Sequence, residues 1–194
     1  MVTTVLSGFS DPVHDAQRTF RGLLEALAHP GQPYKLQPAL SAPDGLTPVC
    51  AAACLSLLDL ETTVWLQPSL SHRVQDWLRF HTGCLFTDDP SAADFAVISD
   101  AFSQPELAAF NWGSAEAPEQ STTLLIQVED FTFGSVQQLS GPGILNRVSF
   151  APNLPETFWQ QRDHWAYPRG VDCFLFTQQS AVSLPRTTCT KAVY

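Results

Sequence analysis

The side chains of this sequence best suited to chemistry are arginines grouped with hydroxyls, histidines or amides. One such group follows the apolar run 181–184, where Pro185 is succeeded by Arg186, Thr187 and Thr188. Arginine presents a fork of N–H donors that fits the oxygens of an anion, and threonine adds hydroxyl donors beside it. The group therefore predicts an anion-binding site, with the alternative that these residues only end a sheet.

A second group lies on an expected helix near the N-terminus. Its members share one face of that helix, which Glu25 continues: His14, Gln17, Arg18 and Arg21. The chain has only ten lysines and arginines, so two arginines three residues apart form a compact set of donors for an anion. The alternative is an ordinary solvated helix face.

A third group, Arg79 and His81, stands just before Gly83 at the end of another expected helix. The sequence leaves three uses open for His81: titration, metal ligation, and capping or packing of the helix end. Capping or packing is the commonest use of a lone histidine. Gly83 itself suits a left-handed C-cap.

The element that carries the second group has clear boundaries. Asp11 can cap it and Pro12 fits its first position, so a helix is expected from residue 13 to about residue 28. The apolar side chains that follow the i, i+3, i+4, i+7 rule predict the face that meets the core. They are Phe20, Leu23, Leu24 and Leu27.

The remaining elements alternate along the chain. Further helices are expected over 48–60, 71–80, 103–113 and 153–165, the last carrying Phe158, Trp159 and Trp165. Residues 136–139 are expected to return beside the central strand 122–128, and 171–176 to form a hairpin with 181–184. Other expected strands cover 34–36, 63–66, 85–87, 95–98 and 147–150. This order predicts one three-layer α/β/α domain over residues 1–194, built around a mixed sheet.

Composition excludes several classes of function. A formal charge of −9 over 194 residues repels phosphate backbones, so no nucleic-acid partner is expected. The sequence shows no signal peptide and no apolar run of membrane-spanning length, which predicts no membrane partner and a cytoplasmic location. Five cysteines are expected to be reduced, and Cys50 and Cys54 to pack in the core, so no metal site is predicted.

Common catalytic motifs are missing. The sequence has no Gly-x-Ser-x-Gly, His-Glu-x-x-His, GxGxxG or CxxC. Of its two lysines, Lys35 lies in or beside an expected short early strand, and Lys191 lies three residues from the end. Neither position suits the Schiff-base lysine that a pyridoxal phosphate enzyme requires, so no cofactor is expected.

Four segments, in succession, carry a family resemblance. They are His14–Arg21 running to Pro30-Gly31, Leu78–Thr82, Leu139–Ile144, and Gly170–Cys173 followed by Leu184–Thr188. Together they resemble PhnH, the phosphonate-metabolism subunit of the bacterial carbon–phosphorus lyase system. The resemblance runs over nearly the whole chain, in order and at similar spacing.

The resemblance implies a fold like the large domain of pyridoxal-phosphate-dependent transferases, without the cofactor or its lysine. It also implies a homodimer that joins a core complex with nucleosidase-like and radical lyase subunits. With those partners the family takes part in displacing adenine from ATP by methylphosphonate, which gives α-D-ribose 1-methylphosphonate 5-triphosphate. The chain would then be a subunit of a transferase complex without independent activity. No catalytic residue can be carried over from the family.

Two hypotheses about this subunit stay open. In the first, it is non-catalytic and stabilises the complex, as the missing motifs and the apolar composition indicate. In the second, it contributes groups that bind ATP or an alkylphosphonate, as the arginines within the matching segments indicate. Those arginines are Arg18, Arg21, Arg79 and Arg186. A third hypothesis, an independent pyridoxal phosphate enzyme, is disfavoured by the lysine positions.

Overall fold

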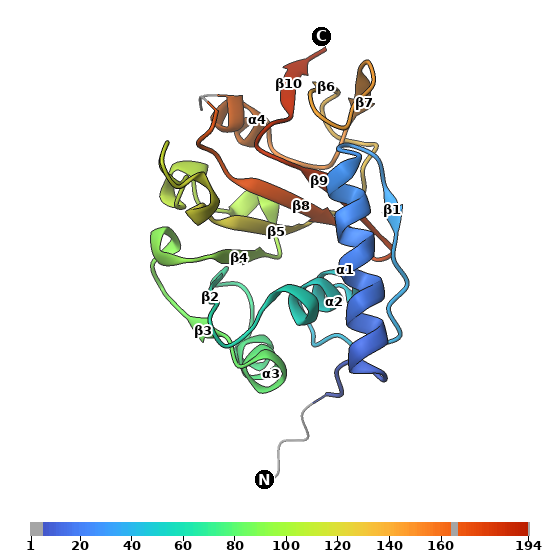
Figure 1. Ribbon diagram of the computed structural model, residues 1–194, viewed down its shortest axis with the longest axis vertical. Coiled ribbons are helices and arrows are strands. Elements are labelled where there is room, and N and C mark those ends of the chain that lie inside the picture. Colours follow the sequence, from blue (N-terminus) through green and yellow to red (C-terminus); the bar gives the residue numbers. More distant parts are fainter. Residues whose placement is uncertain (1–5, 164–166, 194) are drawn as a thin grey trace.

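The computed structural model of the chain describes residues 6–163 and 167–193. In this part of the chain, seven strands form a mixed sheet in the order β1-β9-β8-β5-β4-β2-β3 (Figure 1). The strands from β8 through β5, β4 and β2 to β3 are parallel, whereas β9 runs antiparallel to both β8 and β1. Their bounds are β1 Tyr34–Lys35, β2 Thr63–Leu66, β3 Leu85–Phe86, β4 Phe95–Ile98, β5 Thr123–Gln127, β8 Asp172–Phe176 and β9 Ser180–Leu184. The expected α/β class with a mixed sheet is confirmed.

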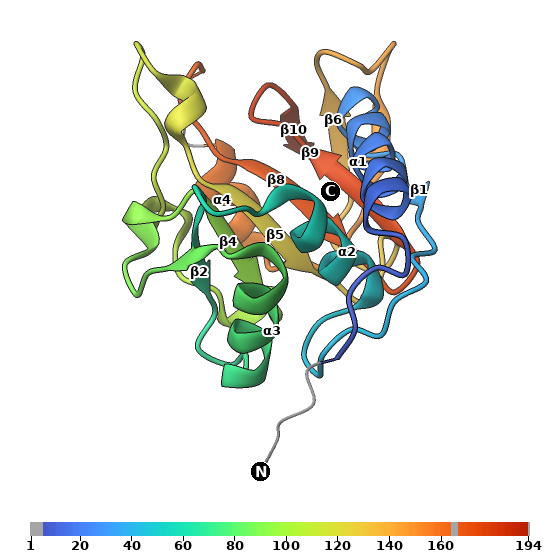
Figure 2. The same ribbon diagram turned by 60° about the horizontal axis from the view of Figure 1, so that its bottom comes forward.

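One face of this sheet is covered by helices α1 (Pro12–Ala28), α2 (Pro48–Leu57) and α3 (His72–Thr82), as Figure 2 shows. Side chains alternate along each central strand, so Leu125 packs towards these helices while Leu124 and Ile126 pack towards the other face. Helix α2 is buried along most of its length and lies between the sheet and its neighbours. No helix in the described ranges is long and apolar enough to cross a membrane.

The opposite face carries a more irregular layer. It consists of helix α4 (Glu156–Asp163), short 3-10 turns and a second, antiparallel sheet in the order β10-β6-β7. The bounds of that sheet are β6 Gln137–Ser140, β7 Val148–Phe150 and β10 Cys189–Ala192. Leu139, Phe150 and Phe158 join the core on this side. Figure 1 shows the small sheet beside the end of the large sheet formed by β8 and β9.

Helix α1 begins as predicted but buries a different face. Asp11 accepts a hydrogen bond from the His14 backbone N–H at 3.1 Å, and the helix ends at Ala28. Of the predicted core residues only Leu23 is buried, whereas Phe20 is 44% and Leu24 48% exposed and Leu27 also faces outwards. The contact stripe is instead made of Thr19, Gly22, Leu23 and Ala26. The small members of this stripe let α1 approach the strands closely, since a Cβ on Gly22 would lie 2.5 Å from the Leu36 side chain.

The strand pairing also departs from expectation in one place. Residues 136–139 do not return beside the central strand, because both edges of β5 are already taken by β4 and β8. Strand β6 pairs instead with β7 and with β10, which the sequence reading did not include. The hairpin of β8 and β9 is confirmed, with Cys173 opposite Leu184.

Three helix predictions need correction. Helix α2 ends at Leu57, and residues 59–62 form a turn around the Asp59 side chain, which accepts from the Thr62 N–H at 3.1 Å. Residues 103–113 form only a 3-10 turn at Leu107–Ala109, because the Leu107 N–H is bound by the Gln161 side chain at 2.6 Å. Helix α4 begins at Glu156 because Pro155 disfavours helical backbone in the residue before it. Trp165, expected on this helix, lies outside the described residues.

Two glycines are required by the backbone. Gly83 has φ 74° and caps α3 in the left-handed conformation, as predicted. Gly143, in the Gly-Pro-Gly segment before β7, has φ 79°. A Cβ there would overlap the Ala28 carbonyl oxygen and lie 2.8 Å from Pro30 Cδ. This turn therefore joins the small sheet closely to the end of α1.

Candidate functional site

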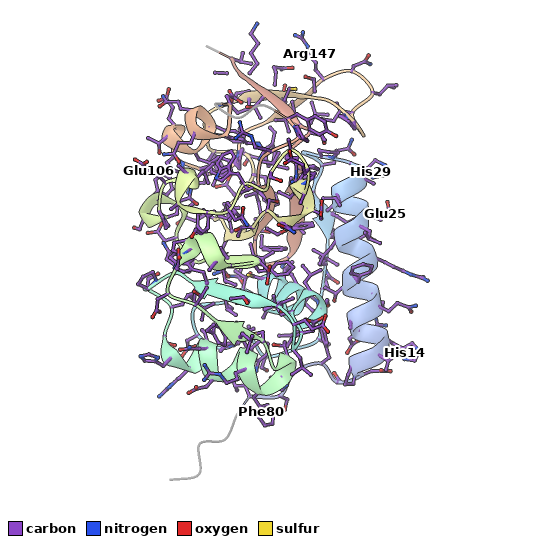
Figure 3. The ribbon with its side chains drawn as sticks, turned by 60° about the vertical axis from the view of Figure 1, so that its left-hand side comes forward. His14, Glu25, His29, Phe80, Glu106 and Arg147 are labelled. Carbon is purple, nitrogen blue, oxygen red and sulfur yellow. The ribbon has the colours of Figure 1, made fainter. Side chains whose placement is uncertain are left out.

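The structure distributes the predicted site residues over three separate places. The first is the outer side of α1, where Figure 3 shows His14 projecting from the helix. His14 Nδ1 lies 2.7 Å from an Asp11 carboxylate oxygen, so the ring supports the helix cap. Arg18 pairs with Asp15, although its side chain is 75% exposed. Gln17 and Arg21 are exposed.

Arg18 and Arg21 also border a shallow cavity of about 550 Å³ between α1 and the segment after β1. Lys35 adds a third cation there, and Asp15 contributes the opposing charge. The ion pair of Arg18 with Asp15 is local and exposed on the arginine side, and exposed ion pairs contribute little stability. Arg18, Arg21 and Lys35 against Asp15 therefore give this cavity a surplus of positive charge.

The second place is the end of α3. Arg79 lies 3.8 Å from Asp76 and stands over the Phe86 ring at 5.1 Å from its centroid. His81 donates from Nε2 to the Leu6 carbonyl at 2.9 Å and packs edge-on against Trp77. The structure thus engages His81 in packing of the N-terminal segment, which is the structural alternative left open by the sequence.

The third place is the segment after β9. The Arg186 guanidinium donates to both carboxylate oxygens of Asp172, at distances of 2.6 to 3.2 Å. It also donates to Ser121 Oγ at 2.7 Å and to the Pro118 carbonyl. Asp172 accepts in addition from the Arg186 backbone N–H at 2.7 Å. Arg186 therefore ties the end of β9 to the start of β8 and to the loop before β5.

Beside Arg186 lies a cavity of about 670 Å³, which we call the C-terminal cavity. It is built by the end of α4, the segment that leads into β8, and the segment between β9 and β10. Thr187 and Thr188, which the sequence analysis grouped with Arg186, line this cavity together with that arginine. The other lining residues are Trp112, Pro142, Arg162, Asp163, Tyr167, Arg169, Gly170, Val171, Cys189 and Thr190.

Arg162, like Arg169, is a residue of this cavity that was not predicted from the sequence. Its side chain is buried, with 8% of its surface exposed. It donates to the Val171 carbonyl at 3.3 Å, to the Leu184 carbonyl at 3.1 Å and to the Pro185 carbonyl. No carboxylate in the described part of the chain forms an ion pair with it. The contacts of Arg162 depend on how α4 packs beside β8 and β9, and the spacing of residues along the sequence does not indicate that packing.

The cavity wall holds two polar atoms that lack partners. Arg162 Nε and Thr188 Oγ1 are buried, and neither has a hydrogen-bond partner among the described residues. Arg169 is exposed at the cavity rim. Asp163 supplies negative charge at the same wall, and one of its oxygens accepts from the Thr190 hydroxyl. Burial raises the pKa of the nearby Cys173 thiol to about 11, even though Arg162 opposes that shift.

A third cavity, of about 540 Å³, opens where the parallel strands β4 and β5 end. Ligands of α/β proteins commonly bind at such strand ends. Its charged lining residues are Asp100 and Glu129, however, and no lysine or arginine contributes to it. Gln127 is held there by the Thr47 N–H and the Gly45 carbonyl. This acidic lining does not suit a polyphosphate.

The sites together define a class of protein. The described residues contain no cluster of three histidine, cysteine, aspartate or glutamate side chains able to hold a metal. Arg18, Arg79, Arg162 and Arg186 contact carboxylates or backbone carbonyls of their own chain. The described residues thus form a mixed-sheet α/β fold with a basic cavity beside the end of β9.

Comparison with known proteins places the chain within that class. The family described as bacterial phosphonate metabolism protein (PhnH) matches residues 7–191. The chain belongs to this family, as its segments indicated.

Two relatives carry names that describe their roles. The chain is 38% identical over 187 residues to the "Alpha-D-ribose 1-methylphosphonate 5-triphosphate synthase subunit PhnH" of Rhizobium meliloti (strain 1021), covering 93% of this chain and 92% of the relative. It is also 38% identical over 79 residues to HtxG of Stutzerimonas stutzeri, which is named as a candidate C-P lyase subunit. That second match covers 39% of this chain and 40% of the relative.

Proposed function

We propose that this chain is a subunit of a carbon–phosphorus lyase complex in the catabolism of organic phosphonates. The complex would form α-D-ribose 1-methylphosphonate 5-triphosphate from ATP and methylphosphonate. The observation that carries this proposal is the 38% identity over nearly the full length of a relative named as a subunit of that synthase. The family match over residues 7–191 supports it.

Within the complex, the proposed role is structural. Three of the arginine and histidine side chains considered for binding have partners inside the chain: Arg79, His81 and Arg186. Arg18 likewise pairs with Asp15. These contacts fix element ends rather than present free donors, which favours a subunit that shapes and stabilises the complex.

Reconstitution tests this role. The variants Arg18→Ala, His81→Ala and Arg186→Ala, when they still assemble with the other subunits, should support normal product formation. Arg147→Ala, which changes an exposed arginine on a different surface (Figure 3), serves as the matched control. An assembled complex that contains one of the three variants and makes no product would refute the structural role.

The same proposal includes a homodimer, and the outer face of α1 supports a second copy as its occupant. Val13, Phe20, Leu24 and Leu27 leave large apolar surfaces exposed there. Together with Gln17 they repeat at alternating steps of four and three residues, which is the spacing of a helix-pairing seam. Contiguous exposed apolar surface of this kind marks an interaction site.

Charge complementarity favours an antiparallel arrangement of the two α1 helices. Arg18 and Arg21 lie in the first part of the seam and Glu25 in the second, where Figure 3 shows Glu25 on the outer side of α1. Antiparallel pairing about Phe20 would bring Glu25 of one copy within one helical turn of Arg18 of the other. Such flanking charges set the orientation of paired helices.

Sedimentation velocity tests the dimer. The unmodified chain should sediment as a dimer, and Leu24→Glu should yield a folded monomer because it places two charges in the seam. Phe133→Glu is the control, since Phe133 is 86% exposed and lies in the loop between β5 and β6. A monomeric unmodified chain, or an unchanged dimer for Leu24→Glu, would contradict this arrangement.

A second candidate function is that the subunit itself contributes groups that bind ATP or methylphosphonate. The C-terminal cavity favours it, because Arg162 lacks a carboxylate partner among the described residues and Arg169 stands exposed at the rim. Calorimetric titration of the chain and of the complex with both ligands tests this function. Unchanged affinity and turnover in variants of the cavity would remove its support.

The fold and location complete the proposal. In the large sheet, β9 lies between β1 and β8 and runs antiparallel to both. Helices α1, α2 and α3 cover one face of this sheet (Figure 2). This supports a relation to the large domain of pyridoxal-phosphate-dependent transferases, which superposition of an experimental structure on such domains would test strand by strand. The cytoplasm is the proposed location, and fractionation of cells that express the tagged chain would check it.

A further inference from the structure

Arg162 carries a charge whose compensation is incomplete. Its two terminal nitrogens donate to three backbone carbonyls, while Nε has no partner among the described residues. Carbonyl dipoles stabilise a guanidinium but do not neutralise it. A buried charge without an opposite charge is costly, so proteins normally pair it or bind a counter-ion beside it. The cavity against which Arg162 packs is where such a counter-ion has room.

Arg169 supplies a second cation at the same cavity, in a different setting. Its side chain is exposed, and it takes part in no hydrogen bond or ion pair with the residues that the structure describes. Its fork of donors is therefore available to an incoming oxyanion. Thr187 brings a hydroxyl group to the same lining, and the buried Thr188 Oγ1 there has no hydrogen-bond partner among the described residues.

The remaining charges of the cavity define what is left for a ligand. Arg186 is already paired with Asp172, so this arginine and this carboxylate offset each other. The negative charge of Asp163 would repel an anion, although one of its carboxylate oxygens accepts a hydrogen bond from the Thr190 hydroxyl. The surplus positive charge accordingly comes from Arg162 and Arg169, one buried and one at the rim.

The size and the other lining residues identify the class of ligand. A volume of about 670 Å³ exceeds what a single ion needs and falls in the range of small-molecule sites. Tyr167, Trp112 and Pro142 offer ring surfaces to an organic portion. Arginine with neighbouring hydroxyls is a donor set suited to the tetrahedral oxygens of phosphate or phosphonate.

We propose that the C-terminal cavity binds the phosphate or phosphonate group of a small molecule, with Arg169 as the direct donor and Arg162 as the buried charge that holds the anion. This inference rests on the second candidate function above and assigns it a place and a donor set. It involves no covalent step. The anion would lie against the segment 186–190, which already joins the large sheet to β10.

Titration of the isolated chain with separate ligands tests the proposal. Inorganic phosphate, methylphosphonate, ATP and acetate are compared by calorimetry at one ionic strength. Binding of at least one phosphorus ligand, with acetate weaker, is the expected result, and the three phosphorus ligands distinguish a free phosphate, a phosphonate and a triphosphate as the source. Equal binding of acetate, or no binding by any phosphorus ligand, would overturn the proposal.

Variants then locate the binding. Arg169→Ala should raise the Kd roughly tenfold or more, as expected for loss of a charge-assisted hydrogen bond, and Arg162→Met should do the same where the variant folds. Arg147→Ala is the matched control and should leave the Kd unchanged. Since Arg169 is exposed, its variant should fold and decide the outcome by itself. Binding that is unchanged in Arg169→Ala would overturn the assignment.

The exposed Cys189, which lines the cavity, gives an independent readout. A bound phosphorus ligand should slow alkylation of Cys189, and Arg169→Ala should abolish that protection. This result separates the inference from the proposed function. If the chain shows neither ligand binding nor protection of Cys189, but the complex still assembles and forms product, the cavity proposal fails and the proposed subunit role stands.

Discussion

Replacing Arg186 by alanine removes the most extensively bonded arginine side chain near the end of β9. The change deletes the donors to both Asp172 oxygens, to Ser121 Oγ and to the Pro118 carbonyl. The Arg186 side chain is 14% exposed and that of Asp172 26%, so water solvates the abandoned carboxylate only in part. Breaking such a pair costs about 3 kcal/mol, the lower end of the range for buried pairs.

For a chain of this size, that loss corresponds to a fall in Tm of roughly 6–12 °C. Urea unfolding followed by circular dichroism measures the free energy directly, and a cycle with Asp172→Ala isolates the coupling between the two side chains. Arg147→Ala is the control and should change stability by less than about 0.5 kcal/mol. A stability of Arg186→Ala equal to that of this control would refute the structural role assigned to Arg186.

Further predictions concern other parts of the molecule. Arg18→Ala should change the free energy of unfolding by less than about 1 kcal/mol in urea titrations, because its pair with Asp15 is exposed. Gly143→Ala should lower it by about 3 kcal/mol, because the new Cβ overlaps the Ala28 carbonyl and φ is 79°; an unchanged midpoint would contradict the contact. Iodoacetamide should label Cys189 in the folded chain before the four buried cysteines, as peptide mass spectrometry would show. The pKa of Asp130 is lowered chiefly by the hydrogen bond from the Thr132 backbone N–H. Ionised Asp130 therefore stabilises the fold above pH 3.8, and this stabilisation is lost as the pH falls through the lowered pKa. Asp130→Ala should remove that part of the dependence of stability on pH.

Local signals were sufficient for much of the fold. The cap at Asp11 and the glycine at the end of α3 are set by neighbours in sequence, and both were predicted. The exposure of one apolar stripe of α1 was not predicted, because the spacing of Phe20, Leu24 and Leu27 fits either a core-facing or an interface-forming helix. The buried stripe depends on Gly22 and Ala26, whose small size matters only once the strands that approach them are known.

The pairing of β6 shows the same limit for strands. Its sequence indicated a strand, but its partners were decided by β5, whose two edges are occupied by β4 and β8. Strand β10 is short and largely polar, and it becomes a strand only because β6 offers an edge. Partner choice of this kind is a property of the whole sheet rather than of either segment.

For the candidate site, sequence spacing grouped neighbouring residues but could not show which distant residues pack beside them. Thr187 and Thr188 were grouped with Arg186, and all three border the C-terminal cavity. The arginine with incomplete compensation is Arg162, which lies on α4 and reaches the cavity only through the packing of that helix beside β8 and β9. Arg18, Arg79 and His81 lie elsewhere and remain candidates without a shared pocket.

The most direct test of the central claim is a reconstituted synthase assay with and without this chain. The other subunits are purified together, this chain is added, and formation of α-D-ribose 1-methylphosphonate 5-triphosphate from ATP and methylphosphonate is followed by phosphorus NMR. We predict that the chain co-purifies with those subunits and that product forms only when it is present. Equal product formation in its absence, with no co-purification, would contradict the account.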